Sequence, residues 1–230
     1  MKILVFGAHP DDVELSIGGI IARHVNQGHE VHICDLTAGE MASNGIPAQR
    51  QEEGRRAAKI LGAAARHNLD LPDGFLTPDK ESLLKTAELV RRVAPEIVLA
   101  PFWVDKHPDH EAASLIVTRA SHLAGLHKFP VAGNRHRPGR IFYYFLARAG
   151  QPSFLVNVDQ WWEQKMAAIM AHSSQFAPRE TGANPTYLNQ QEFFQDYELR
   201  FRQWGREIGC RYAEALVTPD RIKVADLTEI

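Results

Sequence analysis

A chain of 230 residues is long enough to bury the core of an α/β domain without needing crosslinks. Its 26 basic and 28 acidic residues leave a formal net charge of −2, which argues against nucleic acid or an anionic membrane as the main partner. The two cysteines, Cys34 and Cys210, form no C-x-x-C motif, so we expect no disulfide framework and a reducing cytoplasm as the compartment. A strand is predicted within two residues of the N-terminus and no apolar run is long enough to span a membrane, so we expect no signal peptide and no membrane segment.

The first part of the chain predicts strands that alternate with helices. Strands are expected at residues 3–6, 31–37, 68–71 and 97–102, and helices at about 13–26, 48–61, 81–93 and 109–124. This alternation predicts a parallel sheet with right-handed crossovers. In the common strand order 3-2-1-4, the first and fourth strands are neighbours, and ligands bind outside their carboxyl ends.

The last third of the chain is less regular. Residues 125–140 are basic and predict a surface loop, whereas 141–147 and 154–158 predict two more strands, which a hairpin could join. Helices are expected at 160–172 and 192–207. No repeat or linker divides the chain. We therefore expect a single domain over residues 1–230, with a Rossmann-like, doubly wound, mostly parallel sheet.

Two similar polar clusters follow the first and fourth predicted strands. The first is Ala8-His9-Pro10-Asp11-Asp12, and the second contains His107-Pro108-Asp109-His110. In each cluster a proline fixes its own φ and biases the preceding histidine away from helical angles. Because both clusters lie at carboxyl ends of adjacent strands, we expect them to meet in one crevice.

Imidazole nitrogen and carboxylate oxygen are good ligands for a divalent ion such as zinc. His9, Asp12 and His110 supply three such ligands, and three protein ligands with an open position are typical of a catalytic metal site. The expected cofactor is Zn²⁺, with Fe²⁺ as another candidate. A metal bound there lowers the pKa of water and polarises a carbonyl group.

The remaining members of the clusters fit other roles in hydrolysis. Asp11 projects differently from its neighbour on a tight turn and is the candidate general base. His107 is a candidate to stabilise the oxyanion as an imidazolium or to protonate the leaving amine. Asp109 is expected to orient one of the imidazoles.

Each of these residues also has an ordinary structural explanation. Taken alone, Asp11 or Asp12 is most often a helix cap, and His107 a surface residue. The occurrence of two proline-stiffened clusters at one predicted crevice favours the metal site. Elsewhere, the helix dipole accounts for Glu14, and we expect a structural role for His172 at a helix end.

The combination of these clusters resembles the LmbE-like (PIG-L) family of metal-dependent N-deacetylases. The resemblance extends through most of the chain and is strongest to the branch that deacetylates N-acetylglucosaminyl malate in bacillithiol biosynthesis. Further matching motifs are Asp35-Leu36-Thr37-Ala38-Gly39-Glu40, Ser43-Asn44-Gly45, Arg50-Gln51-Glu52-Glu53, Ser174-Gln175-Phe176 and Tyr212-Ala213-Glu214. The resemblance implies zinc on the three proposed ligands, the same roles for Asp11 and His107, and a homo-oligomer, often a hexamer.

The expected reaction is hydrolysis of the N-acetyl group of an amino sugar that carries an acidic aglycone. From chemistry alone, Arg50 is best interpreted as a solvated residue on a charged helix. The resemblance instead implies that it contacts the acidic or acetate portion of the ligand, where a guanidinium fork matches a carboxylate. Asn44 is a second candidate for substrate binding. Tyr187 is too weak a candidate for an oxyanion-assisting tyrosine to be assigned to the site.

Two other functions stay open. One is a deacetylase or amidase that acts on another small N-acyl sugar or a thiol conjugate. The other is a non-catalytic sugar- or nucleotide-binding module. The chain has neither G-x-G-x-x-G after the first strand nor G-x-x-x-x-G-K-[ST], which counts against nucleotide binding.

Overall fold

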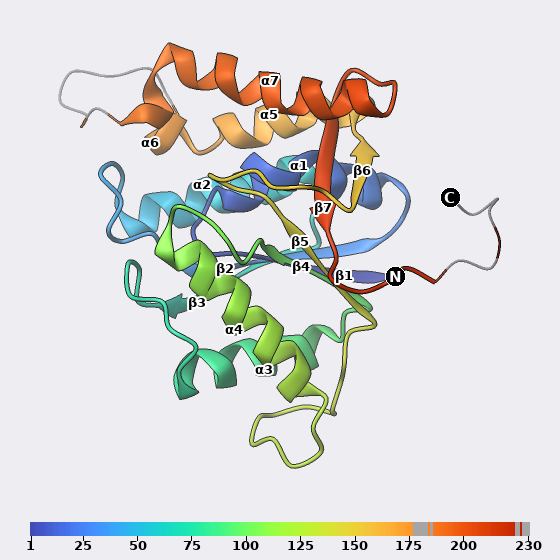
Figure 1. The fold of residues 1–230 in the computed structure, drawn as a ribbon. Helices are drawn as coiled ribbons and strands as arrows, with labels where there is room; N and C mark the ends of the chain where they lie inside the picture. The colour runs from blue at the N-terminus through green and yellow to red at the C-terminus, as the bar shows by residue number, and fades with distance from the viewer. Residues whose placement is uncertain (177–183, 185, 224–225, 227–230) are drawn as a thin grey trace.

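The computed structural model describes residues 1–176, 184, 186–223 and 226. These residues form a seven-stranded sheet with the order β3-β2-β1-β4-β5-β7-β6 and with helices on both faces (Figure 1). The core lies between the sheet and the two helical layers, where the apolar side chains of the central strands are almost completely buried.

The first four strands are parallel, and their order confirms the one expected from the sequence. They are β1 (Lys2–Gly7), β2 (Glu30–Thr37), β3 (Ala65–Leu71) and β4 (Ile97–Pro101). The connecting helices are α1 (Asp12–Asn26), α2 (Pro47–Leu61), α3 (Lys80–Val93) and α4 (Pro108–Ala124). Figure 1 shows α1 and α2 on one face of the sheet and α3 and α4 on the other.

The C-terminal part of the sheet differs from the prediction. Strand β5 (Arg140–Tyr144) is parallel to β4, as expected, but it forms no hairpin with β6 (Phe154–Asn157). Strand β7 (Ala213–Val217) lies between them and is antiparallel to both. The sequence did not predict β7 because Glu214 interrupts a short apolar run, and its burial depends on a partner elsewhere in the chain.

A third layer of helices covers α1 and α2. It comprises η1 (Asp159–Trp161), α5 (Trp162–Met170), α6 (Ser173–Phe176), η2 (Tyr187–Asn189) and α7 (Gln191–Glu207). Helix α5 contacts α1 and α2, and α7 contacts β7 (Figure 1). The helix expected at 160–172 thus becomes a short 3₁₀ turn followed by α5, whereas the helix expected at 192–207 is confirmed.

A fully buried ion pair fixes the shape of α1. Lys165 Nζ donates to Glu214 Oε1 at 2.6 Å, and the Glu214 carboxylate accepts from the backbone N–H groups of Gly19 and Ile20. These acceptors compensate for a break in the helix at Ile17, whose φ of −136° is not helical. The pair therefore holds the first turns of α1, which carry the acidic part of the first cluster, in a fixed orientation.

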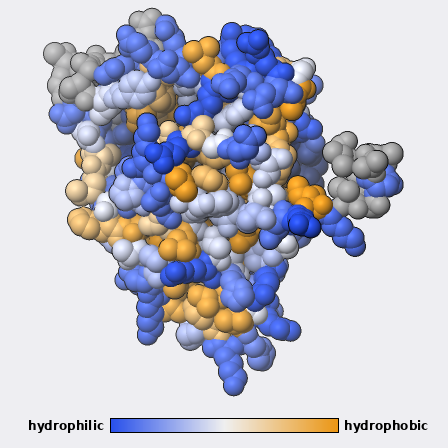
Figure 2. Space-filling model, in the orientation of Figure 1, coloured by the Kyte–Doolittle hydropathy of each residue, from blue (hydrophilic) through white to orange (hydrophobic). Residues whose placement is uncertain are grey.

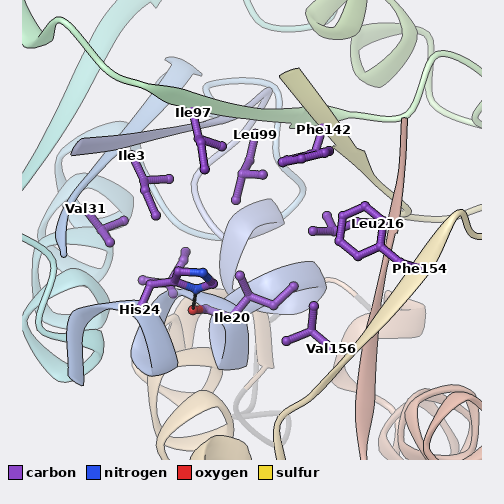
Figure 3. Close-up of a pocket in the computed structure, with 11 residues that line it drawn as sticks. Ile3, Ile20, His24, Val31, Ile97, Leu99, Phe142, Phe154, Val156 and Leu216 are labelled. Carbon is purple, nitrogen blue, oxygen red and sulfur yellow. Dashed lines mark hydrogen bonds between the residues drawn. The ribbon is translucent and has the colours of Figure 1, made fainter. Parts of the chain in front are cut away.

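An apolar cavity of about 120 Å³ lies between the sheet and α1, at the end of β1 remote from the polar clusters. Ile3, Ile97, Leu99 and Phe142 project into it from the strands toward Ile20 (Figure 3). Its polar member, His24, bonds to the carbonyl of Ile20 through Nδ1 at 2.7 Å.

The outer surface carries hydrophilic and hydrophobic residues in alternating small groups on the face drawn in Figure 2. Within the described part of the chain, no helix combines the length and apolar character required to cross a membrane.

Candidate active site

The two polar clusters meet in one cavity of about 600 Å³. His9 follows β1, and His107 and His110 lie at the start of α4, after β4. The cavity is also lined by Arg50 of α2 and by residues of η2 and α7. The structure therefore brings together segments that are far apart in the sequence at the carboxyl ends of β1 and β4.

The turn between β1 and α1 directs its two aspartates differently. The Asp12 Oδ2 atom accepts from the backbone N–H groups of Ala8 and His9, both at 2.9 Å. Asp11 has a φ of 118°, an unusual value for a residue with a side chain, and its carboxylate makes no capping hydrogen bond to α1. A strained backbone of this kind is characteristic of functional sites. The ordinary alternative, a side-chain cap from Asp11 on α1, is therefore not what the structure shows.

The proposed metal ligands surround the Asp12 carboxylate. His110 Nε2 lies 3.3 Å from Asp12 Oδ1, and His9 Nδ1 lies 3.6 Å from Asp12 Oδ2. Ring nitrogens of His9, His107 and His110 also lie within 4.8 Å of one another, as do single ligand atoms of His9, Asp73 and Asp109. Among the described residues both of these groups contain His9 and neither contains Asp12, so the predicted set of His9, Asp12 and His110 stays a prediction.

In His9 and His110, the ring nitrogen that does not face Asp12 (the outer nitrogen) lies close to a carboxylate; the nitrogen that faces Asp12 is the inner one. His9 Nε2 lies 3.0 Å from Asp73 Oδ1 and 3.2 Å from Asp109 Oδ2, and His110 Nδ1 lies 2.9 Å from Asp105 Oδ1. A histidine that binds metal through one nitrogen usually donates the other N–H to such a group, which fixes the ring and its tautomer. This arrangement leaves His9 Nδ1 and His110 Nε2 facing the shared carboxylate of Asp12.

Two of these carboxylates were missed by sequence reasoning. Asp73 lies in Pro72-Asp73-Gly74, a sequence that by itself is typical only of a turn, and it contacts His9 from the segment that follows β3. Asp105 lies two residues before His107, and nothing in its local sequence marks it as a partner of His110. Asp109 lies where a residue that orients His9 should lie, and it also accepts from the backbone N–H groups of Gly74 and Leu76.

The electrostatics of the cluster fit a bound cation. Burial lowers the pKa of His9, but bonds to Asp109, Asp12 and Asp73 outweigh burial and raise this pKa well above its usual value. Burial also lowers the pKa of His110, but the charge of Asp12 and a bond to Asp105 raise this pKa to about 9. The carboxylates thus stabilise positive charge at His9 and His110, and a bound divalent ion would provide such a charge in place of the protons.

Arg50 contacts the candidate base. Its Nη2 atom donates to Asp11 Oδ2 at 3.2 Å and to the Pro10 carbonyl at 2.6 Å, and its Nη1 donates to the Gly39 carbonyl at 3.1 Å. Burial raises the pKa of Asp11, and the Arg50 charge partly offsets this effect. Arg50 lines the same cavity as His9, but its guanidinium fork is already engaged by the chain, and its predicted contact with substrate stays a prediction.

His107 lies at the start of α4, and its ring centroid is 4.8 Å from those of both His9 and His110. Its Nδ1 accepts from the Asp109 backbone N–H at 3.2 Å, so a neutral ring carries its proton on Nε2. Burial and the neighbouring histidines lower the pKa of His107. These effects favour a neutral imidazole that donates a hydrogen bond over the imidazolium considered from the sequence.

The structure does not bring Asn44 into the cavity. Its side-chain amide donates to the Asn184 carbonyl at 3.0 Å and accepts from the Asn184 backbone N–H at 2.9 Å. Asn44 is not among the described side chains that line the cavity. Its backbone carbonyl accepts from Gln175 at 2.7 Å, and Gln175 does line the cavity. The predicted contact of Asn44 with substrate stays a prediction, which these bonds do not favour.

A buried ion network lies beside the site. Arg66 pairs with both oxygens of Asp35, at 2.7 and 2.8 Å, and also with Glu14. His172 is fully buried and its Nε2 lies 3.5 Å from Glu14 Oε2. Burial opposes ionisation of Glu14, but the Arg66 charge lowers the pKa of Glu14 to about 2. Glu14 is therefore held by a buried ion pair with Arg66, and the helix dipole alone does not account for it. The complete burial of His172 fits the structural role expected for it.

The chain shows clear similarity to known proteins. Residues 4–121 match the model of the PIG-L family, described as GlcNAc-PI de-N-acetylase. A conserved protein of Thermus thermophilus has the same fold over almost its whole length, with a TM-score of 0.88 and 39% identity over 98% of this chain and 97% of that chain.

Relatives with assigned activities are less similar. Diacetylchitobiose deacetylase of Thermococcus kodakarensis is 29% identical over 94% of this chain and 82% of its own. A 4-oxalmesaconate hydratase of Pseudomonas putida is also 29% identical, over 75% and 73%. A probable N-acetyl-α-D-glucosaminyl L-malate deacetylase of Bacillus anthracis is 26% identical over 80% and 86%.

Proposed function

Because the chain belongs to the PIG-L (LmbE-like) family of deacetylases, we propose that it is a zinc-dependent hydrolase that removes the N-acetyl group of an amino sugar with an acidic aglycone. The observation that carries the proposal is the pair of imidazoles whose inner nitrogens flank Asp12 while carboxylates hold their outer nitrogens. His9, Asp12 and His110 are the proposed ligands. We favour zinc over iron because three nitrogen and oxygen ligands with one open position suit the tetrahedral coordination of zinc.

A divalent ion bound by these residues supplies an activated water and polarises the amide carbonyl. The chain's own groups then manage the protons. Asp11, whose pKa burial raises, accepts the proton of the attacking water and delivers it to the nitrogen of the leaving amine. His107 donates its Nε2 hydrogen to the carbonyl oxygen as negative charge develops there. Asp109 keeps the ring of His9 oriented.

The substrate class is proposed from two kinds of support. The motifs around the clusters resemble the branch that acts on N-acetylglucosaminyl malate, and the B. anthracis relative carries that activity in its name. The cavity of about 600 Å³ has room for an amino sugar with a small aglycone. We therefore propose N-acetylglucosaminyl malate or a close analogue, with diacetylchitobiose as the neutral alternative suggested by the T. kodakarensis relative.

Acetate release is the test of this function. The zinc-loaded protein is incubated with N-acetylglucosamine, diacetylchitobiose and N-acetylglucosaminyl malate, and free acetate and free amine are measured. We expect both products in equal amounts, fastest from the malate-bearing sugar. The P. putida relative motivates a parallel assay for addition of water to an unsaturated dicarboxylate. Hydration without acetate release would contradict the proposal.

Two further expectations accompany the enzyme. The homo-oligomer implied by the family resemblance is tested by light scattering coupled to gel filtration, and a monomer at micromolar concentration would contradict it. A cytoplasmic location is supported by Cys34 and Cys210, which are both free thiols. Localisation of a tagged copy in the intact cell tests this second expectation.

A further inference from the structure

The main cavity is lined by basic side chains as well as by the proposed metal ligands. Its described lining includes three basic side chains, Arg50, Lys106 and Arg200. Lys106 precedes α4 in the loop that carries His107, and Arg200 lies on α7. The three differ in how much of their charge is already neutralised by the chain.

Arg50 has no free fork to offer a ligand. Its two terminal nitrogens bond to Asp11 and to the carbonyls of Pro10 and Gly39. Its Nε has no hydrogen-bond partner among the described residues but is buried from solvent. A Cβ atom added at Gly39 would lie only 1.8 Å from Arg50 Nη1, which shows how closely the chain surrounds the guanidinium. An acidic group of the substrate therefore needs another cation.

Arg200 is a cation of the cavity that can bind an acidic group of the substrate. Its Nη1 donates to the Leu146 carbonyl at 2.5 Å, and no carboxylate of the described residues lies within 4.0 Å of its guanidinium. The side chain is half-buried, and burial lowers the pKa of Arg200. Partial desolvation of a guanidinium that lacks such a counter-ion is costly, and an anionic ligand offsets that cost with charge-assisted hydrogen bonds.

The neighbours of Arg200 leave it available. Asp196, one turn earlier on α7, also lines the cavity, but its carboxylate accepts from the Tyr187 hydroxyl at 2.8 Å. Asp105, whose charge reaches Arg200, is engaged by His110 and by backbone N–H groups. Lys106 is exposed and adds a second positive charge to the same cavity.

We propose that Arg200, assisted by Lys106, binds an anionic oxyacid group of the substrate at the end remote from the acetyl group, and so determines selectivity for acidic aglycones. This inference rests on the proposed deacetylation, because it divides one substrate between the metal end and the α7 end of one cavity. Carboxylate and phosphate share the required chemistry, since both accept two parallel hydrogen bonds from a guanidinium.

The kinetic test compares Arg200→Gln with Arg206→Gln, a control on an exposed arginine of the same helix. The substrates are N-acetylglucosaminides whose aglycone is malate, phosphate or an uncharged methyl group. Loss of a hydrogen bond to a charged group predicts that Arg200→Gln lowers kcat/KM about 10- to 100-fold on the better anionic substrate, through KM. We expect little change on the methyl glycoside and none from the control. Equal losses on charged and methyl substrates, or no loss on either anion, would overturn the proposal.

Two further measurements keep the test decisive. Lys106 is exposed, so Lys106→Gln should fold normally and weaken only the anionic substrates, by several-fold. Thermal unfolding of the zinc-loaded protein with sodium L-malate or inorganic phosphate tests anion binding without any turnover. We expect an anion-dependent rise in Tm in the wild type that Arg200→Gln loses. If no substrate releases acetate but this rise is present, the proposed function fails while the anion site stands; absence of the rise contradicts the anion site itself.

Discussion

Arg50 Nη2 lies 3.2 Å from Asp11 Oδ2, and the same nitrogen donates to the Pro10 carbonyl that precedes Asp11. One guanidinium thus holds both the backbone and the carboxylate of the candidate base. The backbone of Asp11 is strained, with φ at 118°, and the bonds from Arg50 hold this strained turn in place. Arg50 therefore fits a residue that positions Asp11 better than one that contacts the aglycone.

The first prediction follows from that contact. Burial raises the pKa of Asp11 and the Arg50 charge lowers it, so Arg50→Met should raise this pKa further. The acidic limb of the kcat profile should move to higher pH, with equal losses on charged and neutral substrates. Arg56→Met, on the exposed side of α2, is the matched control. A loss confined to the malate-bearing sugar would instead support the substrate contact first expected for Arg50.

The second prediction separates the two adjacent aspartates. Asp11→Asn should keep the metal while kcat falls by roughly 10²–10⁴, the usual contribution of a positioned base. Asp12→Asn should lower metal affinity, because its oxygens lie 3.3 and 3.6 Å from the inner nitrogens of the two histidines. Zinc content by mass spectrometry and kcat on the same samples decide the assignment. The reverse pattern would mean that the two roles are exchanged.

The third prediction concerns the carboxylate behind His110. Asp105 Oδ1 lies 2.9 Å from His110 Nδ1 and fixes the ring, so Asp105→Asn should weaken zinc binding about 10- to 100-fold. Competition with a chelator measures the affinity. Glu88→Gln, on the exposed face of α3, controls for loss of one negative charge. Unchanged affinity in Asp105→Asn would show that His110 needs no such support, or that it does not bind the ion.

The fourth prediction is a pH dependence of stability. Burial opposes ionisation of Glu14, but the Arg66 charge brings the folded pKa of Glu14 to about 2, below its ordinary value of 4.5. Its contribution is therefore complete above pH 4.5 and is lost as the pH falls toward 2. Glu14→Gln should lower the free energy of unfolding by about 3 kcal/mol at neutral pH, as expected when a buried ion pair is broken.

Urea unfolding from about pH 6 to about pH 2.5, which covers most of the range in which the Glu14 contribution falls, is the corresponding measurement. The difference in free energy of unfolding between the wild type and Glu14→Gln should narrow as the pH falls below 4.5, because Glu14 of the unfolded wild type binds a proton that the folded protein does not. A gap that stays constant over this range would show that the network stabilises the fold by packing and not by charge.

Features that depend on neighbouring residues could be predicted from the sequence, whereas contacts between residues far apart in the chain could not. Both polar clusters could be predicted because each is one turn long and follows an apolar strand. Asp73 could not, because its contact with His9 depends on the register of β3 and β1, whereas its local sequence signals only a turn. Strand β7 was missed for a related reason: Glu214 is acceptable in a buried strand only because Lys165 lies against it. The availability of the Arg200 charge likewise depends on the packing of α7.

The most direct test of the central claim is acetate release measured together with zinc content. The wild-type protein is stripped with a chelator, reloaded with increasing zinc and assayed on N-acetylglucosaminyl malate, with His110→Ala treated in parallel. We predict that acetate release rises in proportion to zinc bound up to one ion per chain, and that His110→Ala loses both together while remaining folded. Acetate release that is independent of zinc, or full zinc occupancy in His110→Ala, would contradict the metal site proposed at His9, Asp12 and His110.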